Sequence, residues 1–182
     1  MRSIPEPPSR WMFAMLLKDK TAMITGAGAG IGKETALLFS EEGAEVIVAD
    51  VDAEAAQGTV DEILNRGSQA TMVQFDVSSQ AEVRSAFEEI QQEYSSLDIL
   101  FNNAGIANQD TLETADLSDY ERVMGVNVKG SFLCSKYALP LLSPDEEPAT
   151  NIINMSSVAG VVGIDGMTTY CTAKAAIIGL TQ

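Results

Sequence analysis

Two residues near the C-terminal end of the sequence, Tyr170 and Lys174, could carry acid–base chemistry. They lie four positions apart, so a helix would place both side chains on the same face. A tyrosine phenol has a pKa of about 10, and a neighbouring cation lowers such a value towards the range in which a general base works. An isolated Tyr-x-x-x-Lys also occurs on ordinary amphipathic helices, so this interpretation depends on the other motifs in the chain.

A glycine-rich stretch at residues 25–32, Thr-Gly-Ala-Gly-Ala-Gly-Ile-Gly, could hold a dinucleotide. It lies between a predicted strand at 22–25 and a predicted helix at 31–42. Glycine lets the backbone turn tightly and approach a pyrophosphate, and the N-terminus of the helix supplies N–H groups. A tight turn without a ligand is the alternative, but the order of strand, turn and helix favours binding. The predicted cofactor contacts in this loop are Gly26, Gly28, Ala29, Gly30, Ile31 and Gly32.

An aspartate, Asp50, ends the predicted strand at 45–50, eighteen positions after Gly32. An acidic residue at about this spacing binds the adenosine ribose hydroxyls of a dinucleotide, and its charge repels a 2′-phosphate. No Arg or Lys directly follows Asp50, and Asp52 is better placed to cap the next helix. The predicted cofactor is therefore NAD rather than NADP, which together with the Tyr170–Lys174 pair indicates hydride transfer.

Strand-like and helix-like segments alternate along the chain, with no internal repeat beyond this alternation. The pattern predicts a doubly wound parallel α/β sheet, Rossmann-like, with helices on both faces. Asp52, Ser79 and Ser118 are the predicted helix N-caps. The predicted strands are 22–25, 45–50, 70–75, 98–102 and 151–155, and the predicted helices are 31–42, 53–66, 79–94, 118–142 and 168 onwards.

Five motifs, spread from about residue 16 to residue 182, resemble those of the short-chain dehydrogenases/reductases. They are the glycine loop at 25–32, Asn-Asn-Ala-Gly at 102–105, Asn-Val-Lys-Gly at 127–130, Ser-Ser-Val-Ala-Gly at 156–160, and Tyr170-x-x-x-Lys174. Ser157, thirteen positions before Tyr170, matches the family's serine better than Ser156. The resemblance implies four catalytic residues, Asn127, Ser157, Tyr170 and Lys174.

The resemblance also implies a role for each residue. Ser157 would bind the substrate oxygen, Asn127 would order a proton-relay water, and Lys174 would hold the nicotinamide ribose beside Tyr170. Asp76 and Val77 resemble the pair that contacts adenine, although Asp76 could simply end a strand. Asn103, Ala104 and Gly105 would line the cofactor cleft, with stabilisation of the sheet as the alternative role.

The implied function is NAD-dependent transfer of a hydride between the nicotinamide and a small secondary alcohol or ketone, with Tyr170 as general acid and base. The alternative is a non-catalytic dinucleotide-binding or partner-binding fragment of the same fold. Family members have further strands and a substrate-binding loop after strand six, so we expect the fold to be incomplete at its C-terminal side. The strand at 151–155 would then be an open apolar edge.

Assembly follows from two predicted helices, 119–142 and 168 onwards, which in the family commonly pair with their copies. We expect a homo-oligomer, a dimer or tetramer, when the fold is complete, and poorly soluble oligomers for the 182-residue form.

Composition excludes several other classes of function. The net charge of −15 opposes binding to nucleic acid. The chain has no histidine, and its two cysteines form no Cys-x-x-Cys, so neither Ser-His-Asp hydrolysis nor a metal site is predicted. The cysteine pattern fits a reducing compartment, so the predicted location is cytoplasmic.

The N-terminal region has an apolar run at 11–17, which is too short to span a bilayer. No small-residue cleavage site follows it, so neither a membrane association nor a secretory signal is predicted. Residues 1–14 are predicted to be a disordered extension, and residues 15–182 the NAD-binding domain.

Overall fold

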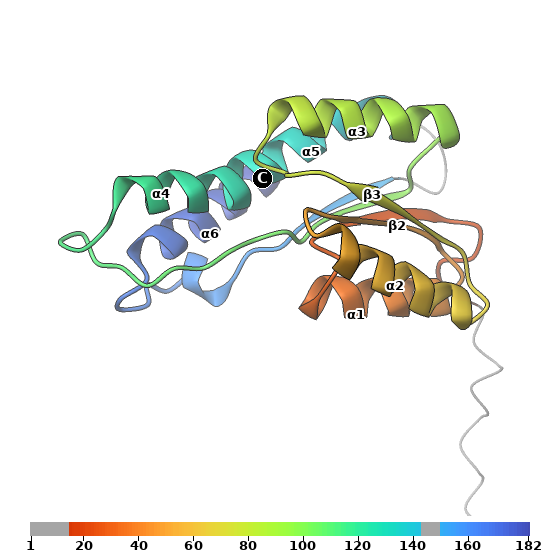
Figure 1. Cartoon of the computed structure of the whole chain (residues 1–182). Coiled ribbons are helices and arrows are strands. Elements are labelled where there is room, and N and C mark those ends of the chain that lie inside the picture. The colour runs from red at the N-terminus through yellow and green to blue at the C-terminus, as the bar shows by residue number, and fades with distance from the viewer. Residues whose placement is uncertain (1–14, 143–149) are drawn as a thin grey trace, which may run out of the picture.

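The computed structural model describes residues 15–142 and 150–182. The predicted extension at 1–14 and the polar stretch at 143–148 lie outside the described residues. Five strands form one parallel sheet in the order β3-β2-β1-β4-β5, which confirms the predicted doubly wound arrangement (Figure 1). The strands are β1 Thr21–Thr25, β2 Glu45–Asp50, β3 Ala70–Gln74, β4 Ile99–Asn102 and β5 Asn151–Asn154.

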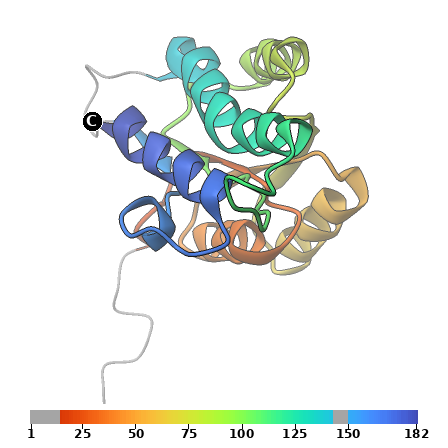
Figure 2. The ribbon, with the colours of Figure 1, turned by 90° about the vertical axis from the view of Figure 1, so that its left-hand side faces the viewer.

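Helices cover both faces of this sheet, with α1 and α2 on one side and α3 and α5 on the other (Figures 1 and 2). Helices α4 and α6 extend beyond the carboxyl ends of the strands and lie beside each other. The α-helices are α1 Gly30–Glu41, α2 Ala53–Asn65, α3 Gln80–Glu93, α4 Leu117–Met124, α5 Gly130–Ala138 and α6 Thr168–Thr181. Three shorter turns are the π-helical η2 Gly125–Lys129 and the 3-10 helices η3 Leu139–Leu141 and η4 Val158–Gly160.

Alternate residues of the central strands supply two separate hydrophobic cores. In β1, Met23 points to the α3–α5 side, whereas Ala22 and Ile24 point to the α1–α2 side. Each of these three side chains is fully buried. Burying one large apolar side chain contributes about 2 kcal/mol, so these two cores fix the position of the sheet against its helices.

The N-terminal caps of the early helices follow the prediction closely. Asp52 caps α2 by accepting the backbone N–H groups of Glu54 and Ala55. Ser79 caps α3 by accepting the N–H of Glu82, whose own carboxylate accepts the N–H of Asp76 instead of completing the predicted reciprocal pair.

The predicted helix at 118–142 is wrong as a single element. It begins at Leu117, and its cap is Asp116, which accepts the N–H groups of Ser118 and Asp119, so the predicted cap at Ser118 is also wrong. The helix is then interrupted by the π-helical turn η2, which carries Asn127. Such turns are frequent at functional sites.

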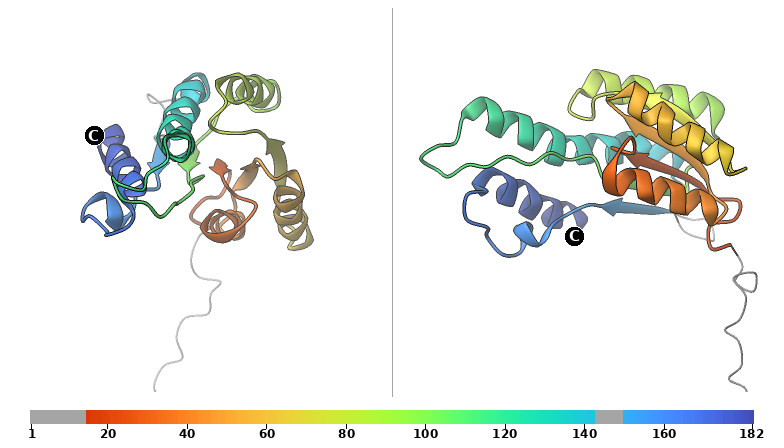
Figure 3. Two further views of the ribbon diagram at one scale, coloured as in Figure 1. Left: turned by 60° about the vertical axis from the view of Figure 1, so that its left-hand side comes forward. Right: turned by 60° about the horizontal axis from the view of Figure 1, so that its bottom comes forward.

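Strand β5 lies at the edge of the sheet in the described part of the chain (Figure 3). Its residues alternate between exposed and partly buried, and the Ile153 side chain is 42% exposed. The expected open apolar edge is therefore present in the structure.

Candidate active site

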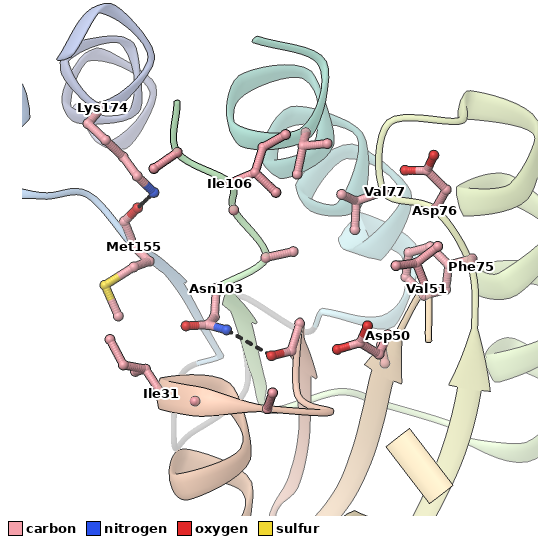
Figure 4. Close-up of a pocket in the computed structure, with 18 of the residues that line it drawn as sticks. Ile31, Asp50, Val51, Phe75, Asp76, Val77, Asn103, Ile106, Met155 and Lys174 are labelled. Atoms are coloured by element: carbon pink, nitrogen blue, oxygen red, sulfur yellow. Dashed lines mark hydrogen bonds between the residues drawn. The ribbon is translucent and has the colours of Figure 1, made fainter. Parts of the chain in front are cut away.

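A cavity of about 530 Å³ lies at the carboxyl ends of the strands, where doubly wound sheets bind ligands. Asp50 and Asp76 lie at one end of this cavity and Lys174 at the other (Figure 4). Of the sequence-predicted site residues, twelve line it: Gly26, Ala29, Gly30, Ile31, Asp50, Asp76, Val77, Asn103, Ala104, Gly105, Tyr170 and Lys174. Four do not: Gly28, Gly32, Asn127 and Ser157.

The glycine loop presents an uncapped helix N-terminus to the cavity. Gly26 and Gly30 adopt φ values of 65° and 55°, which only glycine reaches without strain. The N-cap residue Ala29 makes no side-chain hydrogen bond, and the first turn of α1 contains no acidic residue. The backbone N–H groups and the positive end of the helix dipole are therefore free to receive an anion.

Gly32 serves packing within the loop and does not touch the cavity. A methyl group on Gly32 would lie 2.1 Å from the carbonyl oxygen of Gly26 and 2.5 Å from Asn103 Nδ2. Both distances are far below van der Waals contact. The start of α1 can therefore approach β1 this closely only without a side chain at this position.

Two backbone N–H groups fix the carboxylate of Asp50 at the cavity wall. Gly28 N donates to Asp50 Oδ2 at 2.8 Å, and Asp52 N donates to Oδ1 at 3.0 Å. A methyl group on Gly28 would lie 2.9 Å from the same Oδ2. Gly28 therefore holds the Asp50 carboxylate in place through its N–H group, and a side chain at this position would collide with that carboxylate.

Asn103 joins the end of β4 to the glycine loop. Its Nδ2 donates to the carbonyl oxygens of Thr25 at 3.0 Å and Gly26 at 3.2 Å. The N–H groups of Asn103 and Ala104 both donate to Thr25 Oγ1 at 3.1 Å. The segment thus stabilises the loop and lines the cavity, so its two alternative roles coexist.

Tyr170 and Lys174 lie on the same face of α6, at one end of the cavity. Lys174 Nζ is 5.6 Å from the centroid of the Tyr170 ring. The lysine is 4% exposed and donates to the carbonyl oxygen of Met155 at 2.8 Å, as Figure 4 shows. Burial lowers the pKa of Lys174, because removal from water disfavours the ammonium form.

The side chain of Asn127 lies next to Gly105, and its amide nitrogen makes hydrogen bonds whereas its amide oxygen has no partner among the described residues. Its Nδ2 donates to the carbonyl oxygens of Ile106 at 2.8 Å and Val123 at 2.9 Å. Its buried Oδ1 has no hydrogen-bond partner among the described residues. A methyl group on Gly105 would lie 2.6 Å from this oxygen and 3.3 Å from Lys174 Nζ, so both atoms face the same point.

The two serines after β5 play different structural parts. Ser157 caps η4 by accepting the N–H of Ala159 at 3.2 Å, whereas Ser156 Oγ donates to the carbonyl oxygen of Lys174 at 2.8 Å. A methyl group on Gly160 would lie 2.5 Å from that same carbonyl oxygen. The turn that carries Ser157 is therefore held tightly against α6.

Sequence reasoning missed the apolar part of the cavity wall. These apolar residues lie at the last positions of strands, in the loops that follow the strands, or in η2, and strand ends at a switch point would have been the signal. They are Ala49, Val51, Phe75, Ile106, Ala107, Val126 and Met155.

Within 15–142 and 150–182, no helix has the length and apolar character needed to cross a membrane.

Comparison with known proteins shows which family this chain resembles. Residues 20–182 match the family described as short chain dehydrogenase. The structure is similar to that of a short-chain type dehydrogenase/reductase from Mycobacterium marinum, with a TM-score of 0.85, 34% identity, and coverage of 92% of this chain and 68% of that one.

Two curated relatives give the same result. An uncharacterized oxidoreductase of Thermotoga maritima is 39% identical over 92% of this chain, and secoisolariciresinol dehydrogenase of Forsythia intermedia is 39% identical over 93%. The chain spans 65% and 60% of the lengths of these two relatives. The extent of the family match and the agreement of the folds lead to one conclusion: the chain belongs to the short-chain dehydrogenase family.

Proposed function

We propose that this protein is an NAD-dependent oxidoreductase that interconverts a small secondary alcohol and its ketone. One observation carries the proposal: a single cavity has the Tyr170–Lys174 pair at one end and the fixed carboxylate of Asp50 at the other. The first suits proton transfer, and the second suits recognition of adenosine. The names of the relatives, an oxidoreductase and a dehydrogenase, support the same reaction class.

The residues of the cavity fit a nicotinamide dinucleotide. The uncapped N-terminus of α1 suits the pyrophosphate, and Asp76 and Val77 lie where an adenine would follow Asp50. A dinucleotide held here would supply or accept the hydride. Asp50 favours NAD, because its charge repels a 2′-phosphate. The two backbone N–H groups that donate to its oxygens hold this charge at the cavity wall.

The catalytic roles follow from the positions of the side chains. Tyr170 would exchange a proton with the substrate oxygen, and the Lys174 ammonium lies beside it, 5.6 Å from the centroid of the phenol ring. The unpaired Oδ1 of Asn127 and the Nζ of Lys174 both lie close to Gly105, and a water that bridges the two groups beside Gly105 is part of the proposal. Ser157, which lies outside the cavity lining on the turn held against α6, would bind the substrate oxygen.

Assembly as a homo-oligomer, a dimer or tetramer, is part of the proposal. Phe132 on α5 and Leu139 in η3 are 52% and 61% exposed. Packing against a second copy would remove this apolar surface from water.

The test combines NADH and NADPH titrations with a turnover assay on a panel of secondary alcohols. We expect tighter binding of NADH, and Tyr170→Phe should reduce turnover by about 100-fold or more while the NADH affinity changes by less than about threefold. Equal affinity for NADPH would contradict the role of Asp50. NADH binding without turnover in the unaltered protein would support the alternative, a non-catalytic dinucleotide-binding fragment.

A further inference from the structure

A carboxylate outside the cavity, Asp110, is buried in the loop that joins β4 to α4. Its residue is 6% exposed, whereas the neighbouring Gln109 and Thr111 are exposed. Burying a carboxylate is costly unless hydrogen bonds replace its lost water. The partners of Asp110 therefore indicate what the residue does.

All of these partners tie Asp110 to the start of α6 or to its own loop. Asp110 Oδ1 accepts the N–H of Thr169 at 3.0 Å, and Oδ2 accepts the Thr169 hydroxyl and Asn108 Nδ2. The backbone repeats the connection, because Asp110 N donates to the Gly166 carbonyl and Thr168 N donates to the Asp110 carbonyl. Asp110 and Met167 also form a parallel bridge.

Helix α6 therefore receives its N-terminal cap from a distant segment. Its own N-cap residue, Met167, makes no side-chain hydrogen bond. Asp110 lies 59 positions before Thr169 and supplies the acceptors that a local cap would normally provide. A negative charge at this end of a helix is also favoured by the helix dipole.

The same loop is fixed to the cavity at its other end. The carbonyl oxygen of Ile106, which lines the cavity, accepts Asn127 Nδ2, and the preceding Asn103 is bonded to the glycine loop. Asp110 thus joins the cavity wall to the first turn of α6. Tyr170 directly follows Thr169 in that turn, so its distance from the wall depends on this connection.

We propose that Asp110 is a positioning residue that sets the place of the Tyr170 phenol by capping α6 through Thr169. The proposal rests on the proposed function for its consequence in turnover, but the placement of Tyr170 can be measured without turnover. Asp110 does not touch the cavity and acts only through the helix that carries Tyr170. Because a displacement of about 1 Å can cost about 100-fold in rate, a loose first turn should impair the proton transfer.

The experiment uses the full chain labelled with 3-fluorotyrosine, in which the fluorine resonance of Tyr170 is identified by its loss in Tyr170→Phe. The variants are Asp110→Ala, Asp110→Asn and Thr169→Val, with Asp165→Ala as the matched control. Asp165 is an exposed carboxylate in the loop just before α6, so its removal changes the charge near the helix without removing the cap. Fluorine spectra, NADH affinity, kcat, KM and thermal midpoint are measured for each.

We expect Asp110→Ala to shift or broaden the Tyr170 resonance and to lower kcat by about 10- to 100-fold. KM and the NADH affinity should change by less than about threefold. Asp110→Asn should restore most of both properties, because an amide oxygen can still accept the Thr169 N–H, and Asp165→Ala should match the unaltered protein. If Asp110→Ala does not fold, Thr169→Val, which removes the hydroxyl that donates to Asp110 Oδ2, provides the same measurements, with a smaller shift and loss of kcat in the same direction.

An unmoved Tyr170 resonance in folded Asp110→Ala or Thr169→Val would overturn the proposal, and so would a moved resonance with unchanged kcat. A purely structural role would lower the thermal midpoint and leave the resonance and the kcat of the folded molecules unchanged. If the unaltered protein shows no turnover, the proposed function fails, whereas the fluorine spectra still decide whether Asp110 places Tyr170.

Discussion

The two halves of the molecule bury different kinds of polar group. In the half that carries the glycine loop, the buried polar side chains are the hydroxyls of Thr25, Ser40 and Thr59, each of which donates to a backbone carbonyl. The half from β4 onwards buries amides, a carboxylate and an ammonium group as well as hydroxyls. Its buried polar residues are Asn102, Asn127, Asp110, Lys174, Ser131 and Thr169.

This difference indicates that stability and the proposed function depend on the same features in one half of the molecule and on opposing features in the other. Apolar burial and close backbone contact shape the glycine-loop half, so the features proposed to bind a cofactor there also hold the fold together. In the other half, groups such as the Lys174 ammonium and the unpaired Asn127 Oδ1 lose solvation on folding. Their presence is costly for stability, which agrees with the catalytic roles proposed for these side chains.

A substitution in the glycine-loop half should therefore damage stability and binding together, and Gly32→Ala should give the largest effect. Its methyl group would lie 2.1 Å from the Gly26 carbonyl oxygen, which belongs to the backbone and cannot rotate away. We expect a loss of about 3 kcal/mol in the free energy of unfolding and at least a tenfold loss in NADH affinity. Urea unfolding and NADH titration measure the two quantities.

The matched control is Gly58→Ala in α2, where an added methyl group meets no atom within 4 Å. This change should stabilise the protein by about 0.5–1 kcal/mol, because alanine favours the helix interior, and it should leave NADH binding unchanged. If Gly32→Ala and Gly58→Ala changed the free energy of unfolding and the NADH affinity by the same amounts, stability and binding would not be coupled through the glycine loop.

In the other half, stability and function should separate, and Lys174→Met tests this. Methionine retains the length and the apolar stem of the lysine while removing a buried charge whose hydrogen-bond acceptor is neutral. We expect the thermal midpoint to rise by about 2–4 °C and NADH affinity and turnover to fall. Lys129→Met, at an exposed lysine in η2, should change neither property. A lower midpoint for Lys174→Met would show that the ammonium stabilises the fold.

The same contrast explains how much the sequence could predict. The strands β1 and β2, the glycine loop and the Asp52 cap were predictable because each depends on neighbours in the chain: apolar runs, glycines and a carboxylate before a helix. The break in the predicted helix at 118–142 was not, because Asn127 Nδ2 bonds to the carbonyl of Ile106, twenty-one positions earlier, as well as to Val123. Its side chain competes with the helical ladder only after the fold has brought Ile106 beside it.

Asp110 illustrates the same limit in the candidate site. Nothing near it in the sequence marks it as a cap, since the helix that it caps begins 58 positions later at Thr168. The motif residues Tyr170 and Lys174 could be placed at a cavity from the sequence, because their types and spacing suit one reaction. The groups that hold them, Asp110 and Ser156, act through backbone contacts that only the folded chain creates.

The smallest expected effect is a pH dependence of stability that arises from Asp110. The hydroxyl and the N–H of Thr169 hold the pKa of the Asp110 carboxyl below its ordinary value of 3.8 in the folded protein. A carboxyl with a lowered folded pKa stabilises the fold above its unfolded pKa, and this contribution is lost as the pH falls through the folded pKa. The unaltered protein should therefore be more stable than Asp110→Asn at pH 7, and the difference should shrink below about pH 4. Urea midpoints of both proteins across this range measure it, and in a Thr169→Val background the difference should be small at every pH. If the difference in stability between the two proteins stays constant as the pH falls, the charge of Asp110 does not contribute to it, and the residue acts through its shape alone. The buried carboxylate would then not distinguish this half of the molecule from the glycine-loop half.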